Sequence, residues 1–333
     1  MQLKISLVDW NNLIENILNR YDIYAPIEKY DSVEFQKINE DKIENIEYNR
    51  NRTVSPLKIF FLPTRENVVK DKKIPKKRLI IGAPNCDIMA LNLLDKIYLD
   101  EDFEDDIYKQ NRKNTLIIAH DCYEPDELCH CLVNNVKPYP ENNHDIGISI
   151  IDNSVYLNIE SSKGKDFVKD IDKTIKINEL TSNDKDKIEQ KRKTAISTIT
   201  KNFPKSYTPK EIKQIILNAD DEIWKKYASD CVSCGACSAV CPTCHCFLLI
   251  DKKGFEKIRS WDTCQYPGFE RVAAGEDPLL QLYERFKNRY LCKYAYKPDM
   301  YDAIACTGCG RCIEACIGKI DKNELIMEAD KKQ

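Results

Sequence analysis

The cysteine spacing CxxCxxCxxxC occurs twice in the C-terminal third of this 333-residue chain, beginning at Cys231 and again at Cys306. Three thiolates spaced in this way on a tight loop can bind three corners of a cubane iron–sulfur cluster. The fourth cysteine points away and, in two-cluster ferredoxins, binds the other cluster. The repeat therefore predicts two [4Fe–4S] clusters, each held by cysteines from both motifs.

The two predicted ligand sets exchange their fourth members. The first cluster is assigned to Cys231, Cys234, Cys237 and Cys316, and the second to Cys306, Cys309, Cys312 and Cys241. Gly235 and Gly310 follow the second cysteine of each motif, where a backbone that curls around a cluster tolerates glycine best. Ile317 stands where the first motif has a proline, which predicts altered local packing without loss of ligation.

Three other interpretations of these cysteines carry less weight. Structural zinc sites also use CxxC pairs, but a third evenly spaced cysteine and the duplication favour iron and sulfide. Cys237, Cys241 and Cys244 also have the CxxxCxxC spacing of radical enzymes that use S-adenosylmethionine, and residues 241–244 spell a CPTC thiol pair. Both overlap the longer motif, and too little chain follows for the substrate barrel of a radical enzyme.

The eight remaining cysteines separate into two sets by position. A possible third metal site, for a cluster or a zinc ion, comprises Cys86, Cys122, Cys129 and Cys131. Its first two members follow predicted neighbouring strands, so their thiols are expected at one sheet edge. A possible fourth site comprises Cys244, Cys246, Cys264 and Cys292, whose irregular spacing is a weaker signal. The alternative for both sets is buried, inert cysteine, and the histidines in the two Cys-His-Cys sequences are expected to flank the sites.

Composition limits the classes of partner. The net charge is −3, with 32% charged residues, which gives no global field toward nucleic acid or an anionic membrane. No apolar run approaches the roughly 18 residues of a membrane span, so direct membrane insertion is not expected. Abundant cysteine in a large chain without an apolar leader predicts a reducing, cytoplasmic location. The ten glycines form neither GxGxxG nor GxxxxGK, which argues against a nucleotide or flavin site of the usual kinds.

Hydrophobic periodicity predicts a mixed α/β N-terminal domain over residues 1–200, with a possible metal site of its own. It contains an amphipathic helix from Trp10 to Tyr21, capped at Ser6 or Asp9, and short strands at 57–62, 79–83 and 115–119. A helix at about 87–98 makes the last two strands a βαβ unit, and segments 146–151 and 155–159 make a hairpin. A linker at 201–215, with a hinge near residues 201–209, leads to a helical, ferredoxin-like two-cluster domain at 216–333. The segment between the two motifs indicates a helical rather than a β-rich ferredoxin.

The longer motifs resemble the iron–sulfur beta subunits of cytoplasmic sulfhydrogenases and the related iron–sulfur subunits of anaerobic sulfite reductases. The resemblance spans most of the chain and rests on CDIMALNLLDKIYL from Cys86, NTLIIAHDC ending at Cys122, CVSCGACSAVCPTCHCF from Cys231, RSWDTCQYPGF from Arg259 and CTGCGRCIEAC from Cys306. The sequence departs from this family at Cys292, where such proteins have histidine, and at residues 276–278, where they have an HNP-like stretch.

The resemblance implies an electron-transfer subunit of a multisubunit oxidoreductase. Such subunits relay electrons between a flavin-bearing, NAD(P)H-oxidising partner and a catalytic reductase or hydrogenase subunit. Two further hypotheses remain at this point. One is a catalytic sulfur or sulfite reductase that uses an irregular cluster at the extra cysteines, and the other is a metal-stabilised scaffold without redox function.

Overall fold

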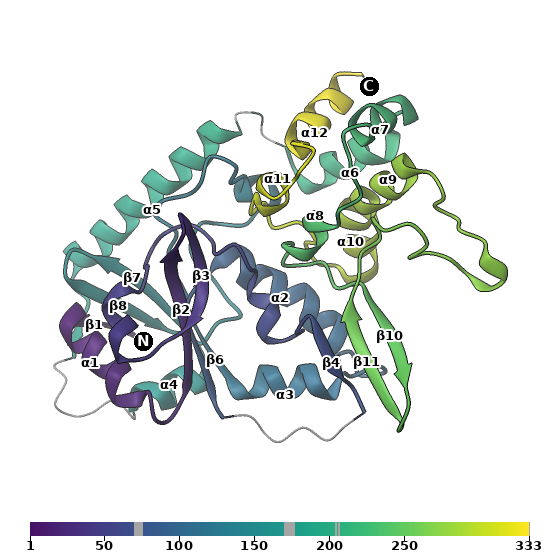
Figure 1. Cartoon of the computed structure of the whole chain (residues 1–333). Coiled ribbons are helices and arrows are strands. Elements are labelled where there is room, and N and C mark those ends of the chain that lie inside the picture. Colours follow the sequence, from purple (N-terminus) through teal and green to yellow (C-terminus); the bar gives the residue numbers. More distant parts are fainter. Residues whose placement is uncertain (70–75, 170–176, 204, 206, 333) are drawn as a thin grey trace.

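The computed structural model describes residues 1–69, 76–169, 177–203, 205 and 207–332 (Figure 1). Within these ranges an eight-stranded mixed sheet has the order β3-β2-β5-β6-β7-β8-β1-β9. The strands are β1 (Gln2–Ser6), β2 (Asp22–Lys29), β3 (Ser32–Lys37), β5 (Arg78–Pro84), β6 (Thr115–His120), β7 (Ile146–Ile151), β8 (Ser154–Ile159) and β9 (Asn178–Glu179).

Alternating side chains of the central strands build two hydrophobic cores. On one face Leu79 and Ile81 of β5 pack with the buried stripe of α1 (Leu7–Ile17) and with α4 (Ser162–Lys169). On the other face Ile80 packs with α2 (Asn85–Tyr98) and with Tyr108 of α3 (Asp106–Asn114). Because successive strand residues point to opposite faces, the apolar runs of β5 and β6 are buried on both sides. The mixed α/β fold class is thereby confirmed.

Several local predictions are confirmed by the structure. Ser6 caps α1 by accepting a hydrogen bond from the Asp9 amide. Strands β5 and β6 pair in parallel and are connected through α2 and α3, and β7 and β8 form the antiparallel hairpin. The C-terminal region is rich in helices, as expected. Its helices are α6 (Pro209–Asn218), α7 (Asp221–Ala228), α8 (Ala236–Ala239), α9 (Leu282–Leu291), α10 (Lys297–Tyr301), α11 (Arg311–Glu314) and α12 (Lys322–Lys331). Helix α5 (Ser182–Asn202) precedes them and contacts β7 of the main sheet.

The strand predicted at residues 57–62 is wrong. Leu57–Phe60 forms a 3-10 helix, with buried Leu57 and Phe61 facing the α2 core. Prolines at positions 56 and 63 flank the segment and lack the amide hydrogens that a strand would donate. The segment instead packs against α2, and the Leu57 amide donates to the Asp87 carboxylate at 3.0 Å.

A second β-sheet lies in the segment between the two cysteine motifs, which the helical interpretation of that segment missed. Strands β10 (Phe247–Lys252) and β11 (Glu256–Trp261) form a hairpin, and β4 (Arg65–Asn67) from the N-terminal region pairs with β11 (Figure 1). All six residues of β10 are exposed. Because neither face of this strand is buried, its sequence lacks the alternation of apolar and polar residues that predicts a half-buried strand. The predicted domain boundaries stay a prediction, and Pro204 in the predicted hinge lies outside the described residues.

Candidate iron–sulfur centres

The two cysteine motifs adopt the same local conformation. Gly235 and Gly310 have φ angles of +74° and +76° and begin the one-turn helices α8 and α11. This left-handed conformation is accessible to glycine at little cost. It turns each loop so that the third cysteine of the motif lies on the short helix and the fourth lies just after it. The expected role of these glycines is confirmed.

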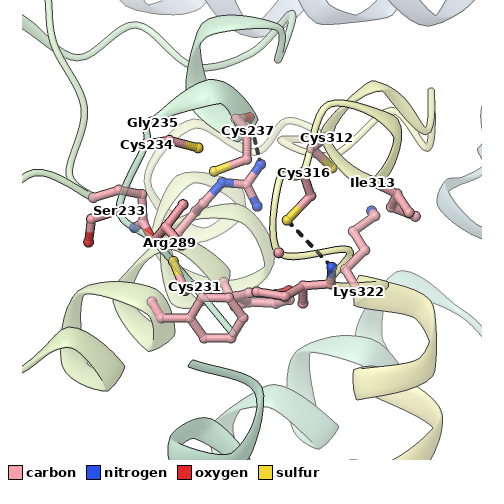
Figure 2. Close-up of a pocket in the computed structure, with 16 residues that line it drawn as sticks. Cys231, Ser233, Cys234, Gly235, Cys237, Arg289, Cys312, Ile313, Cys316 and Lys322 are labelled. Carbon is pink, nitrogen blue, oxygen red and sulfur yellow. Dashed lines mark hydrogen bonds between the residues drawn. The ribbon is translucent and has the colours of Figure 1, made fainter. Parts of the chain in front are cut away.

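The first predicted ligand set surrounds one cavity. Cys231, Cys234 and Cys237 line it from the first motif, and Cys316 lines it from the second (Figure 2). The Ile320 amide donates to the Cys316 sulfur at 3.4 Å, and the Arg289 guanidinium donates to the Cys237 carbonyl at 2.9 Å. The structure thus brings together these four thiols from the two motifs.

The second predicted set also converges. Cys241, from the end of the first motif, lies within electrostatic range of Cys309 and Cys312, and Cys312 lies near Cys306. Cys312 also lines the cavity of the first set. The two sets are therefore direct neighbours, joined through the helix α11 that carries Cys312.

A buried cation contacts the second set. The Lys322 ammonium donates to the Cys306 sulfur at 2.9 Å and to the Tyr294 hydroxyl at 2.9 Å. Burial by itself raises the pKa of Cys306, but Lys322 and the adjacent His130 lower it well below its usual value. The contact with Lys322 thus favours the thiolate form of Cys306, which is the form that binds metal.

The four cysteines of the possible third site meet at the junction between the main sheet and the second motif. Cys86 lies in the first turn of α2 and Cys122 lies just after β6, as predicted from the order of the strands. Cys122 is within electrostatic range of Cys129 and Cys131, and Cys86 is within range of Cys129. Burial raises the pKa of all four thiols.

The second motif packs directly against this third set. A Cβ atom at Gly308 would lie 2.5 Å from the Cys131 Cα and 2.5 Å from the His130 carbonyl oxygen. The His130 amide also donates to the Gly308 carbonyl at 2.9 Å. Backbone atoms rather than flexible side chains occupy this space, so the second and third sets are held close together.

We expect Gly308→Ala to destabilise this junction. The added methyl has no room, and the φ angle of +67° at position 308 is strained for any residue with a Cβ. Such strain costs on the order of 1–3 kcal/mol at any glycine with positive φ, and the clash with backbone atoms adds to it at position 308. Thermal unfolding of the anaerobic protein should show a lower midpoint than Gly254→Ala, a matched control at φ +82° with nothing within 4 Å. Equal midpoints would show that the close approach does not contribute to stability.

The possible fourth set is brought together in part. Cys246 lies close to Cys264, Cys264 also lies within range of Cys244, and Cys244 lies beside Cys241 of the second set. Cys292 begins a π-helical turn (Cys292–Tyr296) that follows α9. It shares the neighbouring Lys297 with Cys244 and Cys246.

Buried cations around the cysteines are the functional residues that the sequence interpretation missed. These cations are Arg52, Lys58, Arg285, Arg289, Lys293, Lys297, Arg311 and Lys322, each at most 8% exposed. Only Arg52 and Arg311 form ion pairs with carboxylates in the described part of the chain. Buried cations without counter-ions are costly, whereas an iron–sulfur cluster with four thiolates carries net negative charge. The surroundings of the thiols therefore fit iron–sulfur clusters.

The spacing of the thiols also bears on the kind of metal centre. Among the described residues, no three His, Cys, Asp or Glu side chains are placed to hold a single metal ion. A zinc ion gathers its sulfur ligands at about 2.3 Å. A cubane is larger, and its four thiolates lie farther apart than the ligands of a zinc ion.

Comparison with known proteins agrees with this geometry. Residues 230–320 match the family described as a 4Fe-4S dicluster domain. The chain is 30% identical over 319 residues to the sulfhydrogenase 2 subunit beta of Pyrococcus furiosus, a match that covers 92% of this chain and 91% of that protein. In the described ranges, no helix has the length and apolar character needed to cross a membrane. The resemblance inferred from the motifs is confirmed: this iron–sulfur protein belongs to the family of sulfhydrogenase beta subunits.

Proposed function

We propose that this chain carries electrons within a cytoplasmic, multisubunit oxidoreductase of the sulfhydrogenase or anaerobic sulfite reductase type. As its electron-transfer subunit, it relays electrons between a flavin-bearing, NAD(P)H-binding partner and a catalytic hydrogenase or reductase subunit. The Pyrococcus furiosus relative is by name one subunit of a sulfhydrogenase, which supports the existence of such partners.

The observation that carries this proposal is the direct contact between the two crossed cysteine sets. Cys316 completes the first set and Cys241 the second, and Cys312 borders both. Each set binds one [4Fe–4S] cluster, which accepts and releases a single electron when bound. Neighbouring ligand sets keep the distance between centres short, which is what a relay requires.

The third set extends the proposed relay toward the main sheet. Cys86, Cys122, Cys129 and Cys131 bind a further cluster, and the Gly308 contact places this set beside the second. The Arg311 guanidinium lies between them, near both Cys86 and Cys309. The second set is then a junction with neighbours on more than one side, rather than the end of a linear chain of centres.

Redox cycling of the isolated chain tests this function. The anaerobically purified protein, reduced by one equivalent of dithionite at a time, is expected to bleach in the visible range and to recover its absorbance when oxidised by a viologen dye. It is expected to consume neither sulfite nor polysulfide. Sustained turnover of either compound by the isolated chain would support the catalytic alternative. Zinc without sulfide would support the scaffold alternative.

A further inference from the structure

The surroundings of Cys244, Cys246 and Cys264 contain three buried lysines from separate parts of the fold. Lys58 comes from the 3-10 helix, and Lys293 and Lys297 come from the π-helical turn and the start of α10. They are 3%, 4% and 8% exposed. In the described structure their ammonium groups donate only to neutral oxygens, those of Ser238, Thr243 and Cys244.

Each lysine is held in place by specific contacts. Lys58 donates to the Cys244 carbonyl at 2.8 Å and to the Ser238 carbonyl at 3.3 Å, and it lies 4.1 Å from the centre of the Trp261 ring. Lys297 donates to the Thr243 carbonyl at 2.9 Å, and Lys293 donates to the Thr243 hydroxyl. Three fixed positive charges thus meet at the peptide that carries Cys244.

No carboxylate balances these charges in the described part of the chain. Asp262 lines the same cavity as Lys58, Cys244 and Cys246, but its carboxylate accepts from the Thr263 amide and forms no ion pair with the lysines. Burying ammonium groups without a counter-charge is unfavourable. The balancing negative charge must therefore come from the cysteine sulfurs near Lys58 and Lys293 and from an anionic centre that they bind.

The local backbone is also unusual. Cys292, Lys293 and Lys297 belong to or directly follow the π-helical turn, a rare conformation that is frequent at functional sites. The His245 Nδ1 atom is buried without a hydrogen-bond partner, and its ring packs edge-on against Tyr98. These features lie outside the two motifs that define the dicluster domain.

We propose that Cys244, Cys246, Cys264 and Cys292 bind a separate anionic iron–sulfur cluster whose charge is balanced by Lys58, Lys293 and Lys297. The contact between Cys244 and Cys241 places this centre beside the second cluster. Positive charge next to a cluster favours its reduced, more negative form, so the lysines raise its reduction potential. This inference rests on the proposed electron-transfer function and adds a lysine-lined branch to the relay.

Ligand variants of the full chain, purified anaerobically, test the site. Cys264→Ser is expected to lose about four irons and four sulfides per chain, together with one EPR signal, while the signals of the other clusters persist. If Cys264→Ser does not fold, Cys246→Ser, whose side chain borders the open cavity, takes its place. Unchanged iron, sulfide and EPR signals in these variants would overturn the fourth site. They would leave the electron-transfer proposal intact, because that rests on the other cysteine sets.

A comparison of Cys292→Ser with His245→Ala tests which residue is the fourth ligand of this cluster. Cys292→Ser is expected to lose the same iron and signal as Cys264→Ser, whereas His245→Ala is expected to keep both. Loss of iron in His245→Ala with none in Cys292→Ser would overturn the assignment of Cys292.

Charge variants test the role of the lysines without relying on activity. Lys58→Met is expected to keep its iron but to shift the signal of the fourth cluster to lower potential in an EPR-monitored redox titration. Lys58→Arg, which preserves the charge, should restore most of the shift. Lys322→Met should instead move the signal of the second cluster, because Lys322 contacts Cys306. No shift in Lys58→Met, or the same shift in all three variants, would overturn the charge-balancing role.

Discussion

Cys316→Ser is expected to remove the first cluster although the CxxCxxC of the first motif stays intact. Of the four cysteines in the second motif, the crossed arrangement assigns only Cys316 to the first set. Cys316 lines the same cavity as Cys231, Cys234 and Cys237. Replacing its thiolate leaves three ligands around that cavity. We expect a loss of about four irons and of one EPR signal, with the second cluster retained.

Ile317→Ser is the matched control for this variant. Ile317 is the next residue, and it is 66% exposed, so its replacement should leave the iron content and both signals unchanged. If Cys316→Ser instead lost the second cluster and kept the first, each motif would supply all four ligands of its own cluster. The crossed assignment would then be wrong.

Arg311→Met is expected to cause the largest loss of stability among single substitutions in the junction between the main sheet and the second motif. The Arg311 guanidinium forms two hydrogen bonds with Asp87, at 2.6 and 2.8 Å, and a third with the Thr53 carbonyl at 2.7 Å. The side chains of the pair are 1% and 0% exposed. Removing the cation leaves the Asp87 carboxylate buried and uncompensated, which costs about 3–5 kcal/mol.

Chemical denaturation of the anaerobic protein measures this effect as a change in the free energy of unfolding. Lys213→Met is the control, because the Lys213–Asp299 pair is partly exposed and is expected to contribute no more than about 1 kcal/mol. Adding Asp87→Asn to Arg311→Met should recover part of the loss, because it removes the unpaired charge. A loss for Arg311→Met equal to that for Lys213→Met would show that the ion pair does not hold the two regions together.

The regular parts of the fold were predictable because local patterns determine them. The short, continuous apolar runs of β5 and β6, with the helical period of α2 between them, led to the correct βαβ unit. That unit in turn placed Cys86 and Cys122 within range of the same thiol, that of Cys129. The segment at 57–62 was mistaken for a strand because a short apolar run does not distinguish a strand from a buried 3-10 turn.

The cysteine spacing predicted which thiols converge in the two main sets, but it carried no information on how those sets contact their surroundings. Lys58 is 186 residues from Cys244 in sequence, and Arg311 is 224 residues from Asp87. Contacts of this kind follow from tertiary packing, and local sequence patterns do not predict them. Some of these cations, such as Arg311 and Lys293, stand next to a cysteine in the sequence, but lysines and arginines on the solvated surface can do so too.

Iron and sulfide analysis, with EPR during graded reduction of the anaerobically purified chain, tests whether adjoining iron–sulfur clusters are present. We expect at least about eight irons and eight sulfides per chain, and signals that broaden by spin–spin interaction as neighbouring clusters become reduced together. Zinc in place of iron and sulfide, or signals that stay sharp and independent at full reduction, would contradict a relay built from adjoining clusters.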